Sequence, residues 1–148
     1  MLVGRFGNTT GRPYIEGRLI FPKLGLTGDI SFLADTGADK TVLMPIDGAR
    51  LGIDYTKLKN SVITIGVGGE ARDFVEPGVL IFVEAGLAVH AYGIDVYVAA
   101  LTSYNATIPS LLGRDIMDRW AITFDRSKDR LTAEVRSADE TELLGQKN

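Results

Sequence analysis

The sequence contains no cysteine and only one histidine, His90, among its 148 residues. Without cysteine, a disulfide framework and thiolate chemistry are both excluded. A single histidine cannot by itself form a metal site, which ordinarily needs three or four side-chain ligands. We therefore expect a protein that works without a metal or any other cofactor.

Long apolar runs and an excess of one charge are also missing. No run approaches the roughly 20 apolar residues that span a bilayer, and the N-terminal "MLVGRFGNTTGRPY" lacks the continuous apolar core of a signal peptide. The 16 basic residues are scattered among 19 acidic ones, for a net charge of −3. A basic surface for nucleic acid is therefore not expected. These features predict a soluble, cytoplasmic protein with neither nucleic acid nor membrane as a partner.

The residues that are present favour one folded, all-β domain. A chain of 148 residues with 45% hydrophobic and 24% charged residues is long enough for one core and too short for two ordinary domains. Its apolar segments are short, rich in Val, Ile, Phe and Tyr, and bounded by turn-forming residues, which is typical of strands. The predicted strands are 14–21, 26–34, 61–66, 70–75, 78–86, 87–100, 121–125 and 130–135.

One internal stretch has helical spacing. In "GRDIMDRWA", residues 113–121, the apolar Ile116, Met117 and Trp120 fall on one face of a short helix. Of these three, the large side chains of Met117 and Trp120 are expected in the core rather than on a binding surface. His90 is expected to be an ordinary, partly exposed strand residue.

The stretch "SFLADTGADKTVLMP", residues 31–45, places a carboxylate, a hydroxyl and a glycine directly after an apolar strand. Asp can act as a general acid or base, but its ordinary pKa of about 3.9 makes it a poor acid near neutrality. A second carboxylate at hydrogen-bonding distance would let the pair share one proton. The chain offers one such Asp, so a two-fold symmetric dimer would have to supply the other.

Three segments in this order resemble the retropepsin-like aspartic proteases. "FLADTGADKTVL" is similar to their active-site segment, "VITIGVGGEARDF" to the flap that closes over the substrate, and "LLGRDIMDRWAITF" to the glycine, Arg and short helix near the C-terminus. The continuation "DRSKDRLTAEV" resembles cellular members more than viral ones. The resemblance implies a closed acid-protease β-barrel with one short C-terminal helix, functional as a homodimer on extended peptide or protein substrates.

Carried over residue by residue, the resemblance implies the site. Asp35 would be the catalytic aspartate, Thr36 the hydroxyl that braces the two protomers, and Gly37 the motif glycine. Arg114 would give structural support by a bidentate bridge to Asp39. The implied substrate-binding residues are Ala38, Asp39, Ile65, Gly66, Val67, Gly68 and Gly69. Residues 1–13 would be a flexible N-terminal segment, 14–136 the protease domain and 137–148 a polar C-terminal tail.

Two other functions have to be weighed against this interpretation. A catalytically silent dimeric module could keep the fold and only bind peptides or partners, although the intact Asp35-Thr36-Gly37 argues against it. A phosphate-handling protein would need a lysine-bearing phosphate loop, which "IGVGG" at residues 65–69 does not provide. The preferred interpretation is hydrolysis of peptide bonds by a water activated between two Asp35 carboxylates, one from each protomer.

Overall fold

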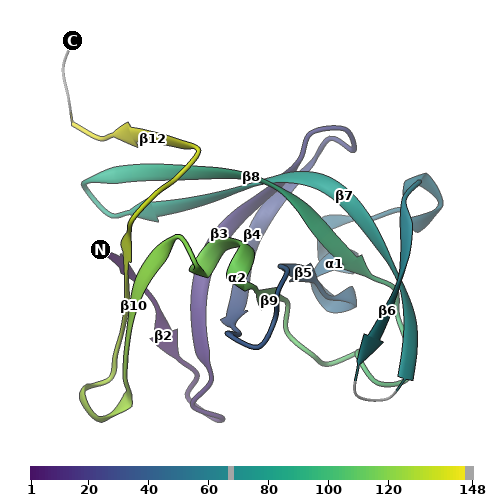
Figure 1. The fold of residues 1–148 in the computed structure, drawn as a ribbon, viewed down its shortest axis with the longest axis horizontal. Helices are drawn as coiled ribbons and strands as arrows, with labels where there is room; N and C mark the ends of the chain where they lie inside the picture. The colour runs from purple at the N-terminus through teal and green to yellow at the C-terminus, as the bar shows by residue number, and fades with distance from the viewer. Residues whose placement is uncertain (67–68, 146–148) are drawn as a thin grey trace.

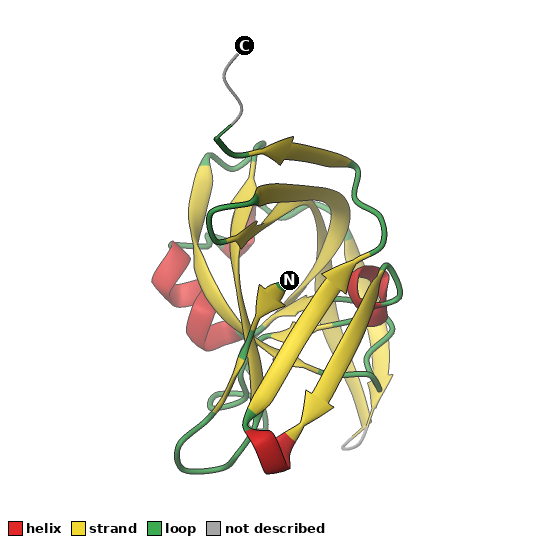
Figure 2. Ribbon diagram, turned by 90° about the vertical axis from the view of Figure 1, so that its left-hand side faces the viewer, coloured by secondary structure: helices red, strands yellow, loops and turns green. Residues whose placement is uncertain are grey.

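The computed structural model describes residues 1–66 and 69–145. Strands dominate these residues and the helices are short (Figure 2). The strands are β1 (Leu2–Val3), β2 (Arg5–Phe6), β3 (Pro13–Phe21), β4 (Leu26–Ala34), β5 (Val42–Leu43), β6 (Ser61–Gly66), β7 (Gly69–Glu84), β8 (Ala88–Ala99), β9 (Leu111–Leu112), β10 (Trp120–Asp125), β11 (Arg130–Val135) and β12 (Glu140–Leu143). The helices are α1 (Pro45–Leu51), α2 (Arg114–Met117) and the 3-10 turns η1 (Tyr55–Lys57) and η2 (Arg126–Lys128).

Six strands close into a barrel. Each strand pairs with the next in the order β8, β5, β9, β4, β3 and β7, and β7 pairs back to β8 (Figure 1). The pairs β4–β9 and β5–β8 are parallel, whereas the others are antiparallel. Strands β1, β11 and β10 form a separate three-stranded sheet. The predicted all-β class and closed barrel are confirmed.

The core fills the inside of this barrel because the strands alternate between apolar and polar residues. Along β3, the inward-facing Leu19 and Phe21 are fully buried, and Phe32 on β4 and Phe82 on β7 face them. The Phe82 and Trp120 rings meet edge to face with centroids 4.8 Å apart. Burial of this apolar area is the main stabilising contribution to the fold. The predicted core positions of Met117 and Trp120 are confirmed.

The long hairpin of β7 and β8 departs from the predicted strands. Segments 70–75 and 78–86 are one continuous strand, which pairs with β8 from Asp73 opposite Ala99 to Glu84 opposite Ala88. The prediction left Glu76 and Pro77 between two strands and began the second strand at Gly78. A side chain at Gly78 would lie 3.3 Å from the carbonyl oxygen of Ile20, so the glycine lets β3 approach β7 inside a continuous sheet.

The helices also differ from the prediction of a single short helix. Helix α1 was not predicted, because Gly48 lies in its middle and no apolar face repeats along it. Its two termini follow ordinary rules: a proline begins it, and Gly52 ends it in the left-handed conformation at φ +88°. Helix α2 is only four residues long and ends before Trp120, which begins β10 instead.

Short strands lie in both terminal segments. In residues 1–13, which the sequence predicts to be flexible, β1 pairs with β11, β2 pairs with β3, and the Leu2 and Phe6 side chains are buried. Two apolar side chains at this spacing are enough to anchor the segment to the core. The predicted polar tail, 137–148, contains β12, which pairs with β8 and has exposed side chains throughout.

His90 is buried, and the expectation that it is partly exposed was wrong. Its side chain is 5% exposed, with Nε2 lying 2.5 Å from Oε1 of Glu84 and Nδ1 lying 2.9 Å from Oγ1 of Thr141. The Thr141 partner could not be identified from local sequence, because Thr141 comes from a strand 51 positions further along the chain. His90 therefore links the β7–β8 hairpin to β12.

Candidate active site

Asp35 lies directly beyond the end of β4, where the parallel partner β9 holds the backbone. Leu33 pairs with Leu111, and the Leu33 amide donates to the carbonyl of Ser110 at 2.8 Å. The Asp35 amide donates to the carbonyl of Leu112 at 3.1 Å. Because both hydrogen bonds come from buried strand backbone, the position of Asp35 is fixed by the barrel rather than by a free loop.

A tight turn organises the three residues after β4. The Gly37 amide donates to Oδ1 of Asp35 at 2.9 Å, and the Ala38 amide donates to the Asp35 carbonyl at 3.1 Å. This is an Asx-type turn, in which the Asp side chain replaces a backbone acceptor. A Cβ atom at Gly37 would lie 3.2 Å from the same Oδ1 and would crowd the carboxylate.

The exposure of this turn explains how the chain tolerates a charge after a core strand. Asp35 is half-buried, whereas Thr36 and Gly37 are exposed. The Asp35 carboxylate therefore keeps part of its hydration and accepts an amide hydrogen bond, so the cost of burying an ion is avoided. Among the described residues, no hydrogen-bond partner accounts for the exposed Thr36 hydroxyl.

A second layer of contacts holds the turn from below. The Arg114 amide donates to the Ala38 carbonyl at 2.8 Å, and the Asp115 amide donates to the Asp39 carbonyl at 3.2 Å. The fully buried Thr41 donates its hydroxyl to Oδ1 of Asp115 at 2.7 Å and its amide to Oδ2 at 3.0 Å. Segment 113–115 is therefore attached to segment 38–41 by both backbone and side chains.

Gly113 makes this contact possible. Its amide donates to the Thr41 hydroxyl at 3.2 Å, and a Cβ atom at this position would lie 2.6 Å from the Lys40 carbonyl oxygen. No side chain fits at that distance, so only glycine allows the two segments to touch. The sequence interpretation included neither Asp115 nor Thr41 among the site residues. The sequence did offer one signal for these two residues, because Thr41 lies shortly after the "DTG" motif and Asp115 directly after "LLGR".

Arg114 and Asp39 form an exposed ion pair. One hydrogen bond joins Nη2 of Arg114 to Oδ1 of Asp39, where the resemblance implied a bidentate bridge of two. The side chains are 47% and 77% exposed, and the Asp39 carboxylate raises the pKa of the Arg114 guanidinium above its ordinary value. Exposed pairs of this kind contribute little to stability. The backbone hydrogen bond of Arg114 to Ala38 is the stronger brace.

Strands β6 and β7 form the hairpin that the sequence interpretation identified as a flap. They pair from Ser61 opposite Phe74 to Gly66 opposite Gly69, so Ile65 and Gly69 lie at its far end. The Ile63 and Ile65 side chains are 64% and 81% exposed. The predicted tip residues Val67 and Gly68 lie outside the described residues. The exposed isoleucines give the hairpin an apolar surface without a partner in the described chain.

On the other face of this hairpin, Thr64 and Asp73 form a polar pair. The Thr64 hydroxyl donates to Oδ2 of Asp73 at 3.0 Å. Burial raises the pKa of Asp73 above its ordinary value, and the hydrogen bond from Thr64 opposes that shift. The two faces of the hairpin therefore differ, with the half-buried polar pair on one and the exposed isoleucines on the other.

The loop between β8 and β9 carries further exposed apolar side chains. Asn105 organises it: Oδ1 accepts from the Thr102 amide at 2.8 Å, and Nδ2 donates to the Ala100 carbonyl at 2.9 Å. Leu101 and Tyr104 are 68% and 75% exposed. The loop ends at Ser110, whose carbonyl holds β4 next to Asp35. The sequence interpretation did not include this loop among the site residues.

No helix in the described residues is long and apolar enough to cross a membrane.

Comparison with known proteins identifies the family. The family model described as "Aspartyl protease" matches residues 24–116, which include Asp35, the β6–β7 hairpin and Arg114. No curated protein matches the chain. Among solved structures, a retropepsin-like aspartic protease from Rickettsia conorii is similar with a TM-score of 0.55 and 25% identity, over 97% of this chain and 92% of that one.

A second solved structure, the EIAV protease complexed with the inhibitor HBY-793, has a TM-score of 0.47 and 23% identity, over 76% of this chain and 90% of that one. The family match covers more than half of the chain and includes each segment that builds the turn around Asp35. The chain belongs to the aspartyl protease family, and it is a retropepsin-like protein.

Proposed function

We propose that this chain is an aspartic endopeptidase that works as a homodimer, with one active site built from the Asp35 residues of both protomers. Because the two carboxylates lie on a two-fold axis, they share one proton and have opposite roles at any moment. The ionised Asp35 takes a proton from water, while the protonated Asp35 of the partner donates to the scissile carbonyl. The water attacks directly, so no covalent acyl-enzyme forms.

The observation that carries this proposal is the position of Asp35. It follows a core strand, is held by the Leu112 carbonyl, and is followed by a turn that leaves its carboxylate half-buried beside an exposed surface. A catalytic group needs such a fixed backbone together with access to substrate. Among the described residues the carboxylate accepts one hydrogen bond, from the Gly37 amide, and forms no ion pair, so it has room for further donors such as water or a partner carboxyl group.

The remaining site residues have proposed supporting roles. Thr36 braces the two protomers through its hydroxyl, and Gly37 leaves room for the carboxylate. Arg114 supports the loop through Asp39 and Ala38. The proposed substrate-binding residues are Ala38, Asp39, Ile65, Gly66, Val67, Gly68 and Gly69.

The proposed substrate is an extended peptide that lies between the β6–β7 hairpin and the Asp35 turn. Extended peptides bind such sites by strand-like backbone hydrogen bonds, with side chains alternating into pockets. The exposed Ile63 and Ile65 of the hairpin and Leu101 and Tyr104 of the loop before β9 are apolar. They favour a preference for apolar residues near the cleaved bond.

The experiment that tests the function is digestion of a diverse peptide mixture, from acidic to neutral pH, by the wild type and by Asp35→Asn. Cleavage by the wild type alone, read by mass spectrometry, would support the protease. The control is Thr56→Ser, an equally conservative change at an exposed position on the 3-10 turn η1. Cleavage by neither protein, from a sample shown to be a folded dimer, would favour the silent binding module. Equal cleavage by both would exclude Asp35 as the catalytic group.

A further inference from the structure

Strands β3 and β7 of the closed barrel pair over only part of their length, at Arg18 to Ile20 opposite Ile81 to Val79. Before Arg18, β3 continues with β4, whereas β7 continues with β8. Strand β2 takes the edge of β3 at Pro13 and Tyr14, so residues 15–17 of β3 keep an edge without a described strand partner. Strand edges of this kind accept extended peptides.

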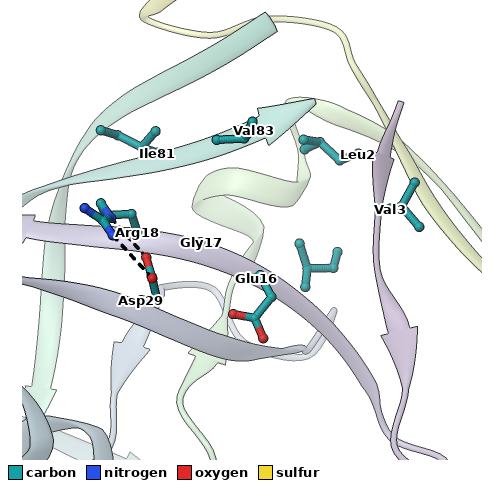
Figure 3. A pocket seen from close by; sticks show the side chains of 9 residues that line it. Leu2, Val3, Glu16, Gly17, Arg18, Asp29, Ile81 and Val83 are labelled. Carbon is teal, nitrogen blue, oxygen red and sulfur yellow. Dashed lines mark hydrogen bonds and ion pairs between the residues drawn. The ribbon is translucent and has the colours of Figure 1, made fainter. Parts of the chain in front are cut away.

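A groove of about 450 Å³ lies at this edge (Figure 3). The side chains of Ile81 and Val83 on β7, with Val3 on β1, give it an apolar lining. Val3 and Val83 are 76% and 57% exposed, so this lining is in contact with water. Exposed aliphatic side chains gathered in a concave surface indicate a binding surface more often than scattered ones do.

A second groove, of about 460 Å³, continues the first on the other side of Ile81. Val89 and Ala91 on β8 extend the apolar lining, and β12 forms the wall. Within the described residues β12 pairs only with β8, so its outer edge is open. Because both grooves share Ile81, they form one continuous trough across β3, β7, β8 and β12.

The rim of this trough is acidic. Glu16 and Asp29 line one side, where Nη2 of Arg5 lies 3.6 Å from Oε1 of Glu16, and Glu140 and Glu142 line the other. Arg18 is the one cation in the lining, and it is occupied by Asp29, with Nε lying 3.0 Å from Oδ1 and Nη2 lying 3.3 Å from Oδ2 (Figure 3). The hydrogen bond from Arg18 lowers the pKa of Asp29, which keeps this carboxylate charged. An apolar floor between carboxylates is complementary to a cationic, aliphatic ligand.

We propose that this trough docks an extended segment of a partner protein in which aliphatic residues alternate with lysine or arginine. The aliphatic side chains lie on Ile81 and Val83, and the long cationic side chains reach the carboxylates of Glu140 and Glu142. In Figure 1, β12 and the β6–β7 hairpin lie toward opposite ends of the long axis of the molecule. The residues that line the trough include none of the Asp35 turn or of the β6–β7 hairpin, so the trough is a separate surface that would hold a partner protein.

The probe for this surface is a fluorescein-labelled peptide, Lys-Val-Lys-Ile-Lys-Val-Lys, titrated with the full chain carrying Asp35→Asn so that it is not cleaved. We expect a Kd on the order of 0.1 mM that weakens with salt, because exposed charges are screened. Glu140→Gln with Glu142→Gln is expected to weaken binding about threefold to tenfold. Val83→Ser, at an exposed position, should weaken it by about threefold or more without affecting folding.

The matched control is Asp95→Asn with Glu134→Gln, which removes two exposed carboxylates outside the trough and changes the net charge equally. It should bind the peptide as tightly as the parent. Amide NMR shifts should centre on Ile81, Val83, Val89 and Ala91. Three results would each overturn the proposal: no binding at about 1 mM, equal weakening by the control pair, or shifts centred on the β6–β7 hairpin and Asp35. Tighter binding of the analogous Glu-Val-Glu-Ile-Glu-Val-Glu peptide would overturn it as well.

Discussion

Gly113 shows how one residue without a side chain sets the geometry of a whole site. Its Cα lies against the Lys40 backbone, and a Cβ atom would be 2.6 Å from the Lys40 carbonyl oxygen and 2.8 Å from the Thr41 amide nitrogen. These are backbone atoms, which cannot rotate out of the way as a flexible side chain could. Segment 38–41, which follows the Asp35 turn, must therefore move if any other residue replaces this glycine.

We predict that Gly113→Ala destabilises the protein by about 1–3 kcal/mol, because an added methyl group overpacks this contact. Urea unfolding followed by circular dichroism measures the change. Gly93→Ala is the control, since the Cβ atom there would meet only Oδ2 of Asp139, at 3.8 Å. That variant should be neutral or slightly stabilising. Equal losses in the two variants would show that the backbone at Gly113 can yield.

Thr41 is the second residue on which the site depends. Its hydroxyl is buried, donates to Asp115 and accepts from the Gly113 amide. We predict that Thr41→Val costs about 1–3 kcal/mol and lowers peptidase activity, because the shape is kept while the partners lose their hydrogen bonds. Thr41→Ser keeps the hydroxyl and should retain most of the activity. If serine and valine behaved alike, packing rather than hydrogen bonding would position the turn.

Among the elements, the segment after β11 acts as a strap across the barrel. Arg119 donates from Nη1 to Oδ1 of Asp139 at 2.8 Å, and the Gly93 amide donates to Oδ2 of the same carboxylate at 2.8 Å. Tyr92 donates its hydroxyl to the Ser137 carbonyl at 2.9 Å. These contacts hold residues 137–139 against β8 and α2–β10, although their side chains are mostly polar. They also place β12 at the wall of the trough.

The strap predicts a pH-dependent stability. Two hydrogen bonds lower the pKa of Asp139 below its ordinary value of 3.8. The bond from Arg119 has the larger effect, and the bond from the Gly93 amide adds to it. Ionised Asp139 therefore stabilises the fold above about pH 4, and this contribution is lost as the pH falls through the lowered pKa. Asp139→Asn should melt at a lower temperature than the wild type at neutral pH, and the difference should vanish in acid.

Thermal melts of both proteins across this pH range measure the effect. Asp95→Asn is a suitable control, because Asp95 is an exposed carboxylate on the same strand as Gly93. It should melt like the wild type at every pH. A constant difference between Asp139→Asn and the wild type down to the most acid pH would mean that the Asp139 charge does not hold the strap.

At the scale of the whole molecule, the proposed site is incomplete in one chain. Each chain has one carboxylate in the Asp-Thr-Gly setting, so catalysis by a shared proton requires two chains. We predict that mixing the wild type with Asp35→Asn lowers activity more than dilution does. Heterodimers would hold one carboxylate, and an equal mixture should show about a quarter of the activity of the same total amount of wild type.

The mixing experiment requires subunit exchange, which sedimentation of differently labelled chains can verify. Arg136→Lys, an exposed change on the loop after β11, provides the control partner: it keeps Asp35, so its mixture with the wild type should be as active as the same total amount of wild type. Activity that is strictly proportional to the wild-type fraction, in a sample with verified exchange, would show that each chain acts alone.

The sequence by itself determined the family, the all-β class and the order of the motifs. These follow from short-range information: alternating apolar residues define strands, and Asp35-Thr36-Gly37 and Leu111 to Arg114 are contiguous segments. Core positions such as Met117 and Trp120 were also predictable, because large apolar side chains have few other places to lie. Each of these features can be recognised without knowing what lies beside it.

Only the tertiary structure decided the contacts between distant segments. Thr41 meets Asp115 across 74 positions, and His90 meets Thr141 across 51. Pro77-Gly78 continues a strand because β3 approaches it closely, and Leu2 anchors the N-terminal segment because the core has room for it. A propensity describes what one segment prefers alone. Its final state depends on the free energy of packing against neighbours that the local sequence does not identify.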